Sequence, residues 1–82
     1  MSLLKYAFEA AERGKSTTIA YNAANEVAAL AFIDKKCGFT DIPKIVRKVL
    51  DYDWNIEPAS IEEVLSEDKK ARDIAYAELA KL

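Results

Sequence analysis

The fold is decided by residues 16–36, which read STTIAYNAANEVAALAFIDKK. If this stretch is helical, apolar side chains cover nearly its whole circumference, and a helix that is apolar on most sides is buried on most sides. We therefore predict a mostly buried, central helix that starts at a hydroxyl residue and is ended by Gly38. Its apolar residues are Ile19, Ala20, Ala23, Ala24, Val27, Ala28, Leu30, Ala31, Phe32 and Ile33.

Three other segments repeat apolar residues at the i, i+3, i+4, i+7 spacing of an amphipathic helix. The first covers residues 2–13 and stops at Gly14, the next begins at Thr40 or Asp41, and the last begins at Ser60. The predicted fold is all-α, a four-helix bundle-like domain spanning residues 1–82. The apolar stripes are Leu4, Ala7, Phe8 and Ala11; Ile42, Ile45, Val46, Val49 and Leu50; and Ile61, Val64, Leu65, Ala71, Ala75 and Leu79.

Two details of the last helix and the loop before it can be predicted. Ser60 and Glu63 have the spacing of a capping box, which marks a helix start. Residues 66–68 (SED) leave open whether the last segment is one helix or two. Trp54 lies in the loop and serves either as a lid on the end of the bundle, which we favour, or as an exposed anchor for a partner.

Composition supports helices packed through small side chains. Hydrophobic residues make up 51% of the 82 residues, fourteen are alanine, and there are only two glycines and two prolines. Alanine is the strongest helix former. A chain of this length forms one domain near the lower size limit for a stable core.

The charge balance argues against nucleic-acid or anionic-membrane binding. The net charge is −2 and the pI is near 5.1. Lys44, Arg47 and Lys48 share one helical face, but they lie opposite an apolar stripe, where solvated charges are expected anyway. No stretch has the length of a membrane span, and no signal peptide is visible.

The residue types needed for catalysis are scarce. The chain has no histidine, and Cys37 is its only cysteine, so neither a zinc site nor an activated thiol is expected. Cys37 is interpreted as a small, buried hydrophobic residue in a reducing compartment. Residues 14–16 (GKS) resemble the end of a phosphate-binding loop, but Glu9 stands where that loop requires glycine. We predict no catalytic, cofactor-binding or metal-binding residue.

One polar patch interrupts the apolar helix. Asn22, Asn25 and Glu26 are spaced i, i+3, i+4 and therefore share a face. One interpretation is a site with Glu26 as a base or metal ligand. The other is a structural clasp, with all three side chains mostly buried and bonded to backbone groups of a neighbouring loop or domain. We favour the clasp, because no histidine or second carboxylate stands nearby.

The polar patch is also the centre of a resemblance to a known family. The sequence is similar to the C-terminal part of 1-deoxy-D-xylulose 5-phosphate reductoisomerases from about Leu4 to Leu79. Cys37 departs from the family pattern, where an aliphatic residue is expected. The matching stretches are residues 22–28 (NAANEVA), 31–32 (AF), 38–42 (GFTDI), 60–65 (SIEEVL) and 71–72 (AR).

The resemblance implies a role within a larger enzyme. That enzyme reduces and rearranges 1-deoxy-D-xylulose 5-phosphate to 2-C-methyl-D-erythritol 4-phosphate in the non-mevalonate route to isoprenoids. It is a homodimer that uses NADPH and a divalent cation, Mg²⁺ or Mn²⁺, in the cytoplasm or a plastid-type compartment. Nucleotide-binding and catalytic domains carry those groups, so this helical part is expected to support the catalytic domain and to be inactive alone.

A different class of function is a free-standing helical module that docks a partner helix or peptide. The first helix bears on both interpretations. A domain that normally rests on another keeps an apolar docking face. We expect Leu3, Leu4 and Phe8 to form such a face and to cause weak self-association of the isolated chain at high concentration.

Overall fold

The computed structural model describes residues 3–82, which form four α-helices and no strand. This confirms the predicted all-α class. The predicted start of the first helix at Ser2 lies outside the described residues. The helices are α1 (Leu3–Arg13), α2 (Thr17–Ile33), α3 (Asp41–Leu50) and α4 (Ile61–Ala80).

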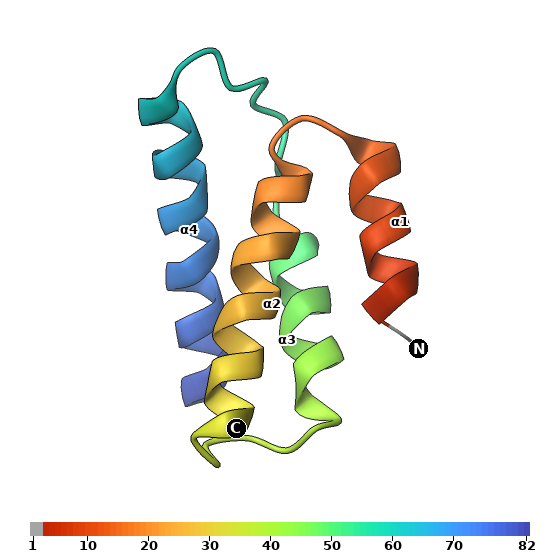
Figure 1. Ribbon diagram of the computed structural model, residues 1–82, viewed down its shortest axis with the longest axis vertical. Coiled ribbons are helices and arrows are strands. Elements are labelled where there is room, and N and C mark those ends of the chain that lie inside the picture. Colours follow the sequence, from red (N-terminus) through yellow and green to blue (C-terminus); the bar gives the residue numbers. More distant parts are fainter. Residues whose placement is uncertain (1–2) are drawn as a thin grey trace.

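The α2 helix is central, as predicted. Figure 1 shows α2 in front of α3, with α1 and α4 on opposite sides of this pair. The α2 helix contacts all three other helices, whereas α1 and α4 share no contact. Among the described residues, no helix combines the length and hydrophobicity needed to cross a bilayer.

The core joins small side chains of α2 to large ones of α3. Alanines allow helix backbones to approach closely, and branched residues from the neighbour then fill the space between them. Ala71 and Ala75 extend the same packing to α4. The remaining core residues include Ala20, Ala23, Ala24, Ala28, Ile45, Val46, Val49 and Leu50.

The α2 helix ends three residues earlier than predicted. Lys35 adopts a left-handed conformation with φ of 61°. Its N–H donates to the carbonyl of Phe32 at 3.0 Å, and the Lys36 N–H donates to that of Ala31 at 2.8 Å. This pair of bonds is the Schellman motif, which normally places glycine in the left-handed position. Lys35 rather than Gly38 therefore ends the helix.

The last segment is one continuous helix. The Glu63 N–H donates to Ser60 Oγ at 3.2 Å, and Glu63 Oε1 accepts from the Ala59 N–H at 2.7 Å, one residue before the position that a capping box uses. The expected apolar stripe is only partly buried, because Ile61 and Leu65 are 70% and 61% exposed. The α4 helix begins beyond the start of α2 (Figure 1), so its first turn extends past the other helices.

Trp54 covers one end of the bundle. It is only 2% exposed, and its Nε1–H donates to the carbonyl of Val49 at 2.7 Å. The Thr17 hydroxyl donates to the Trp54 carbonyl at 3.3 Å, and Lys70 Nζ lies 4.5 Å from the indole centroid. Trp54 is therefore the lid that we favoured, and the alternative of an exposed anchor is wrong.

Candidate functional site

The polar patch of α2 lies on the surface of this domain. Asn22 and Glu26 are exposed and Asn25 is half-buried, so the prediction that all three are mostly buried is wrong for this chain. Glu26 pairs with a side chain rather than with backbone: its Oε1 lies 2.9 Å from Arg72 Nη1, while Arg72 Nε lies 2.7 Å from Asp68 Oδ2. Hydrogen bonds to Asp68 and then to Glu26 raise the pKa of Arg72.

The polar patch is exposed because of its position on the α2 helix. All the α2 alanines except Ala29 are buried against the other helices, and the patch lies on the opposite, more exposed side. Leu30 and Ile33 continue that side and are 54% and 68% exposed. We call Asn22, Glu26, Leu30 and Ile33 the α2 outer face. It is polar at one end and apolar at the other.

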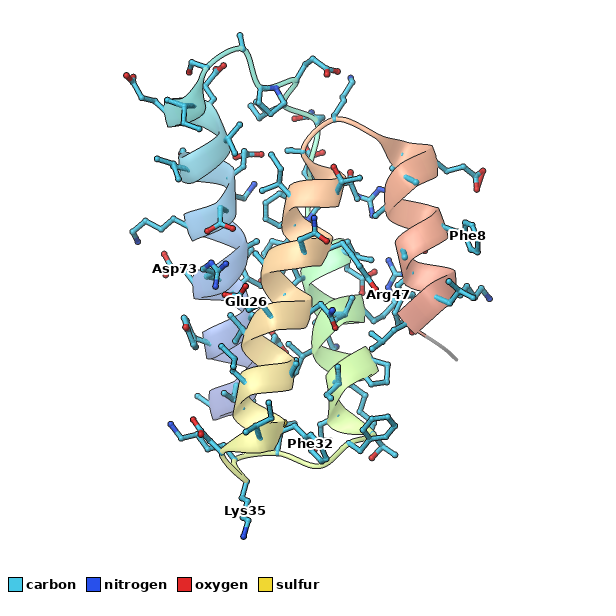
Figure 2. All side chains as sticks on the ribbon, in the orientation of Figure 1. Phe8, Glu26, Phe32, Lys35, Arg47 and Asp73 are labelled. Atoms are coloured by element: carbon cyan, nitrogen blue, oxygen red, sulfur yellow. The ribbon has the colours of Figure 1, made fainter. Side chains whose placement is uncertain are left out.

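A second exposed surface runs along α1. Leu4 and Phe8 are 66% and 65% exposed, whereas Tyr6 and Ala10 point into the bundle. Figure 2 shows Phe8 directed away from the other helices. We call Leu4, Phe8 and Ala11 the α1 outer face. The apolar stripe predicted for this helix therefore lies in solvent, as the expected docking face requires, whereas Leu3 is half-buried.

Charged contacts hold α1 firmly on α3. The two carboxylate oxygens of Glu9 lie 2.7 and 2.9 Å from the guanidinium of Arg47, which also contacts Asp51 at 3.0 Å. The same guanidinium lies 5.2 Å from the centroid of the Tyr6 ring. The hydrogen bond from Arg47 to Glu9 lowers the pKa of Glu9 and raises the pKa of Arg47. The α1 outer face is thus displayed on a fixed helix.

A groove lies between α1 and α3, and its α3 wall runs from Ile42 to Lys48. Its volume is about 780 Å³ and most of its wall is apolar. We call it the α1–α3 groove. Sequence reasoning missed it, because it arises from the relative placement of two helices that are far apart in the chain. Its lining residues are Leu3, Tyr6, Phe39, Thr40, Ile42, Pro43, Lys44, Arg47 and Lys48.

Cys37 and the acidic side chains are the groups of this chain that could act as a nucleophile or bind a metal ion. Within residues 3–82, no group of three or more His, Cys, Asp or Glu side chains is placed to hold a metal ion. Burial, with a smaller effect of Asp41, raises the pKa of the Cys37 thiol, and its Sγ lies 3.8 Å from the carbonyl of Ala28. A raised pKa lowers the thiolate fraction and hence the nucleophilicity.

Sequence reasoning also missed one buried carboxylate. Glu67 on α4 is 7% exposed, and its Oε1 has no hydrogen-bond partner among the described residues. Its spacing of four residues from Ala71 was the available signal, because both then lie on the inner side of α4.

Comparisons with known proteins agree with this picture. A family described as the DXP reductoisomerase C-terminal domain matches residues 1–74. The 1-deoxy-D-xylulose 5-phosphate reductoisomerase of Treponema denticola is 47% identical over 77 residues, which cover 94% of this chain and 20% of that protein. The enzyme of the same name from Proteus mirabilis is 51% identical over 69 residues, covering 84% of this chain and 17% of that protein.

A solved structure extends the likeness to three dimensions. The 1-deoxy-D-xylulose 5-phosphate reductoisomerase from Zymomonas mobilis in complex with NADPH superposes with a TM-score of 0.91 and 44% sequence identity. The match covers 96% of this chain but 21% of that one, so the chain spans about a fifth of the length of its relatives. The family match and these relatives together establish that the chain belongs to the DXP reductoisomerase C-terminal domain family.

Proposed function

We propose that residues 1–82 are the C-terminal helical domain of a 1-deoxy-D-xylulose 5-phosphate reductoisomerase, in which they support the catalytic domain of the same polypeptide. The observation that carries this proposal is that almost the whole chain matches one fifth of an NADPH-bound enzyme of that name. A free-standing interaction module would use the same exposed faces, but the relatives favour the first function.

The chemistry belongs, in this proposal, to the part of the enzyme outside this chain. The full enzyme converts 1-deoxy-D-xylulose 5-phosphate to 2-C-methyl-D-erythritol 4-phosphate as a homodimer, with NADPH and Mg²⁺ or Mn²⁺ bound by its other domains. The side chains described above do not fit either group, and no reaction step is assigned to them. A cytoplasmic location is part of the proposal, since a single unpaired cysteine suits a reducing compartment.

The α2 outer face serves as a clasp across the domain boundary. Within residues 3–82, the side-chain amides of Asn22 and Asn25 make no hydrogen bond. Such groups can pair with backbone N–H and C=O groups of an adjoining loop. This keeps the structural interpretation of the patch but moves its partner from this domain to the neighbouring one.

The α1 outer face explains what the isolated chain should do. Without the rest of the enzyme, Leu4 and Phe8 can be covered by a second copy, most simply in a two-fold symmetric pair. We expect weak self-association at high micromolar concentration. Sedimentation equilibrium measures it, and Leu4→Glu should abolish it. A strictly monomeric parent chain at millimolar concentration would refute this part alone.

Enzyme activity tests the proposal. The full-length polypeptide that carries this sequence should oxidise NADPH only when 1-deoxy-D-xylulose 5-phosphate and Mn²⁺ are both present. The decrease in NADPH absorbance measures the rate, and omission of either component is the control. A folded full-length protein that consumes no NADPH under these conditions would overturn the assignment.

A further inference from the structure

We infer that the α1–α3 groove binds a segment of the longer polypeptide. This segment inserts an apolar side chain into the groove and carries an aspartate or glutamate next to it. This inference rests on the proposed function, because it requires a longer polypeptide. It adds a defined contact to that function, because it specifies which surface of this domain binds another segment and which side chains that segment supplies.

The wall of the groove is suited to an apolar anchor. Leu3, Tyr6, Ile42 and Pro43 line it, and Phe39, which is 69% exposed, stands at its edge. A volume of about 780 Å³ falls within the range of roughly 300–1,000 Å³ that is typical of ligand pockets.

The rim of the groove is suited to a carboxylate. Arg47 is already neutralised by Glu9 and Asp51. Lys44 has only a marginal contact with Asp41 at 4.0 Å, and its side chain is 71% exposed. Lys48 forms no ion pair within residues 3–82. The groove of a chain whose net charge is −2 is thus flanked by one lysine without an ion pair among the described residues and one with only a long, exposed pair.

The occupant is best supplied by the same polypeptide. The matching family is a C-terminal domain, and it makes up about a fifth of its relatives, so most of each relative precedes it. In such a protein the chain enters α1 at Leu3, which itself lines the groove. A second copy of the domain fits poorly, because a two-fold contact of groove on groove would bring the lysines of both copies together.

Photo-crosslinking in the full-length enzyme tests this inference. Replacing Phe39 with the photoreactive analogue p-benzoylphenylalanine places the probe at the edge of the groove. The matched control is the same replacement of Tyr52, an exposed aromatic at the opposite end of α3, about 15 Å away. After irradiation, mass spectrometry should locate the Phe39 crosslink within the same polypeptide, on a segment outside this domain that contains an apolar residue beside Asp or Glu.

The charges provide a second measurement that leaves the apolar wall intact. The double substitution Lys44→Gln and Lys48→Gln should lower the crosslink yield at position 39 by about threefold. A loss of this size is expected when exposed ion pairs are removed. The control is Lys36→Gln, which changes an exposed lysine outside the groove and should leave the crosslink yield unchanged.

The possible failures are distinguishable. Crosslinks only between two polypeptides, equal yields from the Phe39 and Tyr52 probes, or no crosslink in a folded protein would each overturn the inference. A protein that is active with NADPH but gives one of these results retains the proposed function. A crosslink as predicted in a protein without reductoisomerase activity would retain the groove contact and remove that function.

Discussion

Arg47 helps to fix α1 to α3, since its guanidinium binds both carboxylate oxygens of Glu9 and lies over the Tyr6 ring. The side chains of Arg47 and Glu9 are 29% and 32% exposed, so the pair is partly shielded from solvent. Bidentate, charge-assisted pairs of this kind are the stronger class of surface ion pair. Sequence reasoning assigned Arg47 to a solvated face, because its partner is 38 residues away in the chain.

This pair predicts a pH dependence of stability. The pKa of Glu9 is lowered in the folded protein, so its contribution is present above the unfolded-state pKa and is lost as the pH falls through the lowered value. Glu9→Gln should therefore destabilise the protein by about 1 kcal/mol at neutral pH. Urea unfolding at neutral and acidic pH measures the difference, which should shrink in acid. An equal difference at both pH values would contradict this account.

Glu26 should contribute much less to the stability of this domain. Its side chain is 57% exposed, and exposed ion pairs are typically worth between about 0 and 1 kcal/mol. Glu26→Ala should therefore lower the free energy of unfolding of the isolated chain by less than about 1 kcal/mol. A larger loss would be expected if the Glu26 side chain were buried. A measured loss of several kcal/mol would show that the patch is structurally integral to this domain.

At the scale of the element, apolar periodicity identified the helices but not always their buried side. The α3 stripe is buried from Ile42 to Leu50, because α3 lies behind α2 with neighbours along its whole length. In α1 the same rhythm marks an exposed face, since Leu4 and Phe8 point away from the bundle. Periodicity reports that a face is apolar, and only the tertiary arrangement decides whether this domain or another one covers it.

The start of α4 offers a prediction on helix capping. The Ser60 hydroxyl accepts from the N–H of Glu63 and so satisfies one of the free N–H groups at the helix start. Ser60→Ala should cost about 1 kcal/mol, whereas Ser60→Gly should cost only a few tenths. Thermal unfolding of the two variants distinguishes them. Equal losses would mean that the hydroxyl contact does not stabilise the helix.

The end of α2 offers a stabilising substitution. Lys35 has φ of 61°, a region that costs a side-chain-bearing residue roughly 1–2 kcal/mol and glycine almost nothing. Lys35→Gly should therefore raise the free energy of unfolding by about 1 kcal/mol, after the added freedom of the unfolded chain is subtracted. Lys36→Gly is the control, because no left-handed angle occurs there, and it should not stabilise. A loss of stability with Lys35→Gly would contradict the described helix end.

At the scale of the whole molecule, the all-α class and the central position of α2 could be predicted from the sequence. The α1–α3 groove and the exposure of the Asn22 patch could not be predicted in this way. Both depend on how helices from distant parts of the sequence are placed, and a single sequence does not specify which apolar surface is kept for a neighbouring domain. In the proposed function, the exposed faces are surfaces that this domain presents to the rest of the enzyme.

Removing residues 1–82 from the full-length enzyme tests whether this domain supports the catalytic domain, with the rate of NADPH oxidation and the Kd for NADPH measured on the same sample. We predict that the truncated protein loses nearly all activity with 1-deoxy-D-xylulose 5-phosphate, because its catalytic domain loses its support. NADPH should still bind within about twofold of the full-length affinity, a change of about 0.4 kcal/mol. Undiminished activity, or loss of NADPH binding by a truncated protein that remains folded, would contradict it.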